Sequence, residues 1–207
     1  MHTSITRKAG AIALGVALTL SACGSDGGGS DTSTAVSATE HAEADVAFAS
    51  DMVQHHAQAL SMVDLTVGRT LDPEVQQLAE EIRAGQGPEI ETMADWLTEW
   101  GEEVPPTMRD HANAGHDMGD MAESMEGMDT DMPGMMSAEE MAELEEAPDT
   151  EFQTRWLEMM VEHHTGAVEM AEAEQEDGRY APAVELAGSI IESQTAEIET
   201  MEGLLGS

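Results

Sequence analysis

Two adjacent histidines occur twice in the sequence, each time inside an apolar run that is flanked by methionine. The runs are MVQHHAQALSM, which starts at Met52, and MVEHHTGAVEM, which starts at Met160. At helical spacing each histidine lies on a stripe of apolar residues that recur every three or four positions. We therefore expect all four imidazoles to point into the apolar core of a helical domain.

A buried imidazole needs partners for its polar nitrogen atoms, because burial disfavours the charged form and leaves one donor and one acceptor nitrogen. A metal ion can satisfy the acceptor, and a neighbouring polar group can accept the remaining N–H. In both runs a methionine precedes the first histidine by three positions, and thioether sulfur is a soft ligand that suits Cu(I). Ag(I) is expected to bind on the same grounds. The predicted ligands are Met52, His55, His56, Met62, Met160, His163, His164 and Met170.

The polar residues that could support these ligands lie further along each half of the chain. Gln86 and Gln194 occupy equivalent places in the apolar seams of two other predicted helices, so we expect them to accept the imidazole N–H groups. Glu89 and Glu197 are the weaker candidates for this supporting role.

Two other functions are compatible with the same pattern. Ferritin-like di-iron bundles use Glu-x-x-His, whereas this chain has Met-x-x-His, which ranks a di-metal oxidoreductase below soft-metal binding. No other catalytic constellation is evident, and we expect no enzymatic activity. The remaining alternative is a structural or interaction lipoprotein whose core histidines hydrogen-bond Gln86 and Gln194.

An internal repeat organises the domain that carries these residues. A shift of 108 positions maps His55 onto His163, and it also maps QGPEIETM at Gln86 onto QTAEIETM at Gln194. Each copy has the composition of a helical hairpin, with a helix start at Asp72-Pro73 and a capping box at Thr150 and Gln153. The sequence predicts an all-α fold, a ferritin-like four-helix bundle made of two repeated hairpins.

A methionine- and histidine-rich crossover joins the two hairpins. Nine of the 17 methionines lie between Met108 and Met141, mostly among Gly, Asp and Glu. The segment has few large apolar groups, so we expect it to be mobile and to collect soft ions weakly. Its candidate accessory ligands are His111, His116, Met118, Met121, Met125 and Met128.

The N-terminus has the features of an export signal. Arg7 and Lys8 precede an apolar run that is too short for a comfortable transmembrane helix, and the run ends in Leu-Ser-Ala-Cys. This ending resembles a bacterial lipobox, which implies cleavage before Cys23, a lipid on its sulfur and a place on the outer face of the cell membrane. The expected organisation is a signal peptide (1–22), a flexible tether (23–43), and a bundle domain (44–205) containing hairpin 1 (44–100), the crossover (101–136), a short helix (137–147) and hairpin 2 (150–205).

The charge of the chain limits its partners. There are 43 Asp and Glu against 7 Lys and Arg, a formal net charge of −36. Such a surface repels nucleic acid and anionic lipid and attracts cations. The composition is equally compatible with a carboxylate coat that keeps the protein soluble in high salt.

The motifs resemble one family over nearly the whole predicted bundle domain, from Asp45 to Leu205. DVAFASDMVQHHAQALSM, QGPEIETMADWL and MMSAEEMAELEEAPDTEFQTRWLEMMVEHHTGAVEMA are similar to the bacterial domain-of-unknown-function family numbered 305, whose signature is the paired His-His motif. The resemblance implies a ferritin-like, exported protein, and copper binding in the periplasm, because some members have that role. It implies metal-binding roles for the eight ligands named above. The family usually has Asp ten positions before the second His-His, where this chain has Gln153, so the two halves are expected to differ in supporting chemistry or metal affinity.

Overall fold

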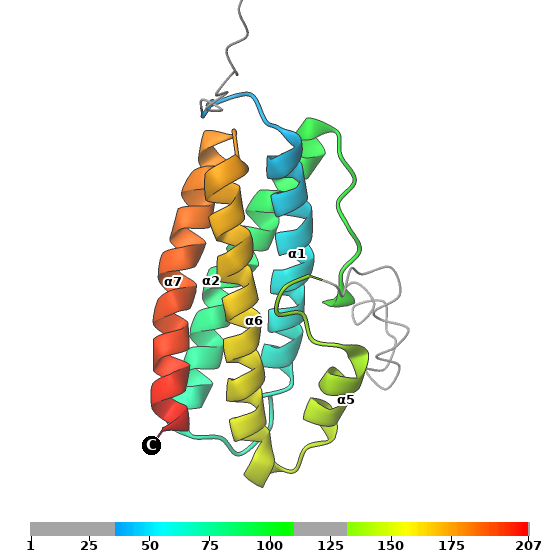
Figure 1. Cartoon of the computed structure of the whole chain (residues 1–207). Helices are drawn as coiled ribbons and strands as arrows, with labels where there is room; N and C mark the ends of the chain where they lie inside the picture. The colour runs from blue at the N-terminus through cyan, green and yellow to red at the C-terminus, as the bar shows by residue number, and fades with distance from the viewer. Residues whose placement is uncertain (1–35, 110–131, 207) are drawn as a thin grey trace, which may run out of the picture. The chain divides into compact units, whose positions relative to one another are not determined.

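The computed structural model describes residues 36–109 and 132–206, which belong to one compact unit. Within these residues the regular structure is helical, apart from an isolated bridge between Ser37 and Tyr180. The helices are α1 (Glu43–Asp64), α2 (Pro73–Trp100), α5 (Ala138–Glu146), α6 (Asp149–Asp177) and α7 (Ala181–Leu205). Figure 1 shows α1, α2, α6 and α7 side by side as a bundle, with the short α5 against α6. The predicted all-α fold is confirmed.

The ends of the helices follow local sequence signals. The Asp72 side chain accepts a hydrogen bond from the Glu74 backbone, and Pro73 occupies the first turn of α2, as predicted. Ser137 and Glu140 form a capping box at the start of α5. The capping box predicted at Thr150 and Gln153 is wrong, because α6 begins after Pro148 without a side-chain cap. The Gln153 side chain is used elsewhere.

Asp45 and Gln153 act as clasps between the two hairpins, at opposite ends of the bundle. One carboxylate oxygen of Asp45 accepts the backbone N–H groups of Arg179 (2.9 Å) and Tyr180 (2.7 Å), while Gln153 accepts the N–H of Asp72 at 2.7 Å. The 108-residue shift maps Asp45 onto Gln153 and Asp72 onto Tyr180. The replacement of Asp by Gln therefore changes a structural clasp, not the surroundings of the second His-His pair.

The last residues of the predicted tether are held against the bundle. The Ser37 backbone donates to the Arg179 carbonyl at 2.6 Å and accepts from the Ala181 N–H at 2.7 Å. The Asp45 carboxylate also accepts the Ala42 N–H, at 2.5 Å, next to the start of α1. Residues 36–42 thus differ from the expectation of a flexible tether, while the rest of the tether and the predicted signal peptide lie outside the described residues.

Both ends of the crossover also pack on the bundle. Met108, Met132 and Met136 are buried, with 3 %, 8 % and 2 % of their surfaces exposed. Met108 and Met136 join the apolar cluster of the lower half of the bundle. The buried positions of Met108, Met132 and Met136 differ from the expectation of a mobile crossover, whereas residues 101–104 are exposed. The middle of the crossover lies outside the described residues.

The core is divided into two apolar clusters. One contains Met62, Trp156 and Met160, and the other contains Phe48, Met52 and Met93. The paired histidines belong to neither cluster, although all four are fully buried. They form a polar layer across the interior, and the pairing of α1 with α6 brings the two histidine motifs together.

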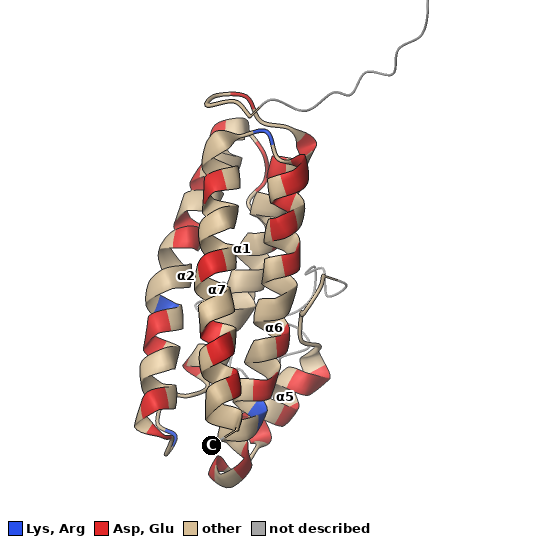
Figure 2. Cartoon of the chain, turned by 60° about the vertical axis from the view of Figure 1, so that its left-hand side comes forward, with Lys and Arg blue, Asp and Glu red and all other residues tan. Residues whose placement is uncertain are grey.

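The surface is dominated by carboxylates. Figure 2 shows Asp and Glu along the visible faces of α2, α6 and α7, with few basic residues between them. Within the described residues every arginine pairs with a carboxylate: Arg69, Arg83, Arg109, Arg155 and Arg179. In the same part of the chain, none of the helices combines the length and the apolar character needed to cross a membrane.

Candidate metal centre

The centre of the polar layer is the contact between His55 of α1 and His163 of α6. Their ring centroids lie 3.8 Å apart with the planes inclined at 42°, and neither side chain is exposed to solvent. Equivalent positions of the two repeats thus meet at the interface of the hairpins. The sequence prediction that both motifs share one core is confirmed by this contact.

The second histidine of each motif is held by a carboxylate on the partner helix of its own hairpin. His56 Nε2 lies 2.7 Å from Glu89 Oε2, and His164 Nε2 lies 2.8 Å from Glu197 Oε2. Both glutamates are 20 % exposed, whereas the imidazoles are fully buried. A carboxylate oxygen accepts here, so Nε2 carries the hydrogen.

These bonds reverse the predicted ranking of the supporting residues. Gln86 and Gln194 are buried, at 3 % and 2 % exposure, but their amide atoms have no hydrogen-bond partner among the described residues. Glu89 and Glu197, the weaker candidates from sequence, support His56 and His164 instead. In both hairpins the histidine and its glutamate are 33 positions apart. This repeated spacing is the sequence signal that could have indicated the two pairs.

Burial favours the neutral form of His55, His163 and His164. It lowers the pKa of His55 to about 3, with the neighbouring His56 adding to the effect and the Pro133 carbonyl opposing it. Burial also lowers the pKa of His163, together with the nearby His55 and His164. The pKa of His164 is lowered by burial although Glu197 acts to raise it. Neutral rings present lone pairs, which is the form in which imidazole binds metal ions.

Several of the ring nitrogens have no protein partner. Nδ1 of His55, His56 and His164 makes no hydrogen bond within the described residues, and neither does Nδ1 or Nε2 of His163. A buried polar atom left without a partner costs about 1–3 kcal/mol. The nitrogens of the layer that carry a lone pair thus have no protein partner, and either a metal ion or a hydrogen-bond donor would satisfy them.

The predicted thioethers are placed at different distances from this layer along the helices. Met52 and Met160 are fully buried and lie one helical turn before His55 and His163 on the same stripes. Met62 is also fully buried, and its carbonyl accepts the indole N–H of Trp156 at 2.9 Å. Met52 and Met160 are therefore better placed than Met62 to supply sulfur to the histidine layer.

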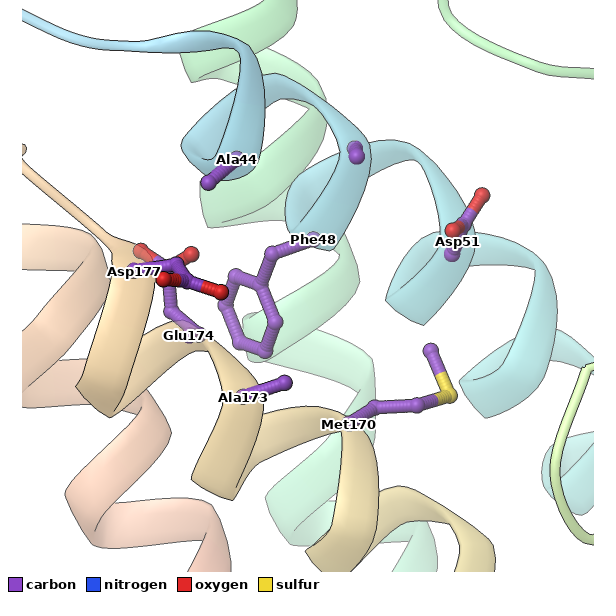
Figure 3. Close-up of a pocket in the computed structure, with 8 residues that line it drawn as sticks. Ala44, Phe48, Asp51, Met170, Ala173, Glu174 and Asp177 are labelled. Atoms are coloured by element: carbon purple, nitrogen blue, oxygen red, sulfur yellow. The ribbon is translucent and has the colours of Figure 1, made fainter.

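Met170 is only partly buried and faces a different feature. It lines a hollow of about 220 Å³ between α1 and α6, together with Phe48, Asp51 and Glu174 (Figure 3). Burial, with contributions from Asp45 and Asp177, raises the pKa of the Glu174 carboxyl to about 8. The carboxyls around this hollow make it chemically distinct from the imidazole layer.

The donor set of the layer fits a soft monovalent ion. Within residues 36–109 and 132–206, no three side chains of His, Cys, Asp and Glu gather as a metal site. The imidazoles that meet directly are a pair, with thioethers one turn away, and both donor types suit Cu(I) and Ag(I). Glu89 and Glu197 place negative charge beside the layer, which reduces the cost of burying a cation. Cys23 and the accessory ligands His111, His116, Met118, Met121, Met125 and Met128 lie outside the described residues.

The chain is similar to a known family and to several solved structures. The family described as "Domain of unknown function (DUF305)" matches residues 45–205. A protein of Streptomyces coelicolor described as a secreted DUF305 protein is 32 % identical, with 79 % of this chain and 92 % of that chain covered and a TM-score of 0.63. A DUF305 fragment from Deinococcus radiodurans is 29 % identical, covering 80 % of this chain and 97 % of that one, with a TM-score of 0.64.

A third similar structure is that of CopM in its Cu(I)-bound form. It is 25 % identical to this chain, with 77 % of this chain and 94 % of CopM covered and a TM-score of 0.58. CopM has also been solved in Cu(II)-bound and silver-bound forms. No curated protein matches the chain.

Proposed function

The chain belongs to the DUF305 family, and on that premise we propose that it binds Cu(I), or Ag(I), in the histidine layer of its bundle. The similarity to CopM, which has structures with copper and with silver, supports this choice of ion. The protein would buffer, store or detoxify copper without catalysing a reaction. The resemblance of Leu-Ser-Ala-Cys to a lipobox supports anchoring as a lipoprotein, through Cys23, on the outer face of the bacterial membrane.

One observation carries the proposal. His55 and His163 are fully buried, lie 3.8 Å apart at the ring centroids, and have ring nitrogens without a protein partner. Fully buried thioethers lie one turn away on the same helices. Two or three neutral imidazole and thioether donors satisfy Cu(I), whereas carboxylate oxygens suit harder ions.

A competition titration tests the proposal. The reduced protein is titrated with Cu(I) against a chromophoric Cu(I) chelator, and the variant carrying His55→Ala and His163→Ala is compared with it. We expect the double variant to lose the tightest site, because it removes both imidazoles that meet at the centre. His41→Ala is the matched control, since His41 is exposed and stacks on Trp100. Equal Cu(I) affinity of the wild type and the double variant would reject the histidine layer as the site.

A di-metal oxidoreductase is the second candidate, and the Glu89–His56 and Glu197–His164 pairs favour it. They place one carboxylate beside one imidazole in each half of the bundle. If these carboxylates bridged two iron ions, adding Fe(II) in air would consume oxygen in proportion to protein. We expect no such consumption, because each carboxylate is engaged by an imidazole N–H. In addition, the residue three positions before the first histidine of each pair is methionine, where di-iron bundles have glutamate.

A purely structural role is the third candidate. The hydrogen bonds to Glu89 and Glu197 could stabilise the core without any ligand. In that case Cu(I) would leave the melting temperature unchanged, whereas an ion that binds only the folded state must raise it. Thermal unfolding of the anaerobic protein with and without one equivalent of Cu(I) separates the two.

A further inference from the structure

A short segment from Met132 to Met136, which we call the strap, lies across the seam of α1 and α6 beside the histidine layer. Figure 1 shows this part of the chain, just before α5, curving in to the middle of α1. The fully buried Gln58 side chain fixes it with two backbone bonds: Nε2 donates to the Met136 carbonyl at 2.8 Å, and Oε1 accepts the Met136 N–H at 2.7 Å. The strap is therefore seated specifically on α1.

On the other side of the seam, two glycines allow the strap to touch the backbone of α6. A Cβ atom on Gly166 would lie 2.0 Å from the Pro133 carbonyl oxygen, and one on Gly134 would lie 2.6 Å from the Glu162 carbonyl oxygen. Gly134 also has a φ of +72°, which favours glycine. No larger residue fits at Gly166 without displacing the strap.

The strap breaks the symmetry of the repeat at the two positions that seat it. The 108-residue shift maps Gln58 onto Gly166, within HHAQAL and HHTGAV. In the first copy this position supplies the side chain that bonds the strap, and in the second it supplies the space that the strap occupies. The two copies thus carry complementary residues at one equivalent position.

The strap also bonds directly to the candidate metal centre. His55 Nε2 lies 3.0 Å from the Pro133 carbonyl oxygen. A carbonyl oxygen can only accept, so this nitrogen carries the hydrogen and the Nδ1 lone pair remains for an incoming ion. Pro133 thereby does for His55 what Glu89 and Glu197 do for the second histidines.

We infer that Gln58 and Gly166 are positioning residues, which seat the strap so that it holds His55 in the Nε2–H tautomer and covers the His55–His163 pair. The inference rests on the proposed function for its role in metal binding, which is to cover the site and to leave the His55 Nδ1 lone pair for the ion. The seating of the strap and the tautomer of His55 are properties of the metal-free protein. They can be measured whether or not copper binds.

Nitrogen-15 NMR of the histidine rings in the metal-free, full-length chain tests the inference. The wild type is expected to show one His55 tautomer, with the hydrogen on Nε2. In Gly166→Ala the added Cβ displaces the strap. His55 is then expected to show both tautomers, or its ring N–H hydrogen is expected to exchange with water. Gly203→Ala is the matched control, because a Cβ on Gly203 of α7 meets no atom within 4 Å.

Gln58→Met provides a second variant that adds no bulk to the seam. It removes both backbone bonds to Met136, so the Met136 amide hydrogen is expected to exchange about tenfold faster or more. A single Nε2–H tautomer in both Gly166→Ala and Gln58→Met, with unchanged Met136 exchange and an intact fold, would overturn the inference.

Cu(I) binding kinetics then separate this inference from the proposed function. If both hold, the Gly166→Ala variant takes up and releases Cu(I) faster than the wild type and the Gly203→Ala control. Altered tautomers with no Cu(I) binding in any variant would support the strap and reject the metal. Normal Cu(I) binding with an unaltered tautomer in both strap variants would support the metal site and reject the strap.

Discussion

Glu197 and Glu89 hold two fully buried imidazoles, those of His164 and His56, from partly exposed positions. Each accepts an Nε2–H from a fully buried imidazole, which orients the ring and increases the basicity of its other nitrogen. Their exposed side remains in contact with solvent. At the residue scale, the carboxylates are thus the link between the surface charge and the histidine layer.

Replacing Glu197 by Gln is expected to weaken Cu(I) binding about tenfold, because a neutral amide supports a metal-binding imidazole less well than a carboxylate. The effect is measured by competition titration at one pH. Glu199→Gln removes the same charge from an exposed position of α7 and serves as the control. Equal losses in both variants would mean that only long-range charge is involved.

The Glu174 carboxyl makes the free energy of unfolding of the protein decrease as the pH rises. Its carboxyl has an ordinary pKa of 4.5 and a pKa of about 8 in the folded protein. Between these values the folded state binds more protons than the unfolded state, so the free energy of unfolding falls with increasing pH. Glu174→Gln should flatten this dependence between pH 5 and pH 8 and stabilise the protein most at the upper end.

Urea unfolding of the metal-free protein at several pH values measures this slope. Glu176→Gln, an exposed change on the same helix, controls for the general repulsion among the acidic residues. If the slopes of Glu174→Gln and wild type were the same, Glu174 would not be the group responsible.

At the scale of elements, the clasps at Asp45 and Gln153 join the hairpins with unequal strength. Burial acts to raise the pKa of the Asp45 carboxyl, but hydrogen bonds from the backbone N–H groups of Tyr180, Ala42 and Arg179 outweigh it, so the pKa is lowered. Gln153 holds one backbone N–H, that of Asp72. Asp45 therefore organises the start of α1, the end of α6 and the start of α7, whereas Gln153 fixes only the start of α2.

Asp45→Ala is accordingly expected to cost about 3 kcal/mol of unfolding free energy, since three backbone N–H groups lose their acceptor, and Gln153→Ala about 1 kcal/mol. Chemical denaturation of the metal-free protein measures both. Equal costs would show that the clasps are energetically equivalent.

The helices and their pairing into two hairpins could be predicted from the sequence, but most contacts between individual residues of different helices could not. The repeated His-His runs, Asp72-Pro73 and Ser137 each act within a few neighbouring residues, so their patterns identified the helices. The roles of Glu89, Gln153 and Gln58 depend on which residue of a distant element lies opposite, which requires the crossing register of the helices. For this reason the sequence pattern favours Gln86 over Glu89 and predicts a capping box at Gln153, whereas in the structure Glu89 accepts from His56 and Gln153 accepts from Asp72.

At the scale of the whole molecule, the negative surface and the neutral interior have different tasks. The formal charge of −36 attracts cations to the protein without selecting among them. Under the proposed function, the buried imidazoles and thioethers make the selection, because soft donors favour Cu(I) and Ag(I). The internal repeat brings His55 and His163 together where the two hairpins meet.

The resemblance of the sequence before Cys23 to a lipobox adds a prediction about where this molecule works. Cys23→Ala should abolish lipid attachment and release the protein from the membrane fraction of the cells that express it, leaving Cu(I) binding by the bundle unchanged. Fractionation and mass spectrometry of the N-terminus measure both effects. Retention of the Cys23→Ala protein in the membrane fraction would show that another feature anchors it.

X-ray absorption spectroscopy at the copper edge, on protein loaded with one equivalent of Cu(I), tests the pairing of imidazole with thioether most directly. We predict nitrogen and sulfur neighbours around the same ion, and loss of the nitrogen neighbours when His55 and His163 are both changed to Ala. A copper environment made of sulfur alone, or one that the two substitutions leave unchanged, would contradict it.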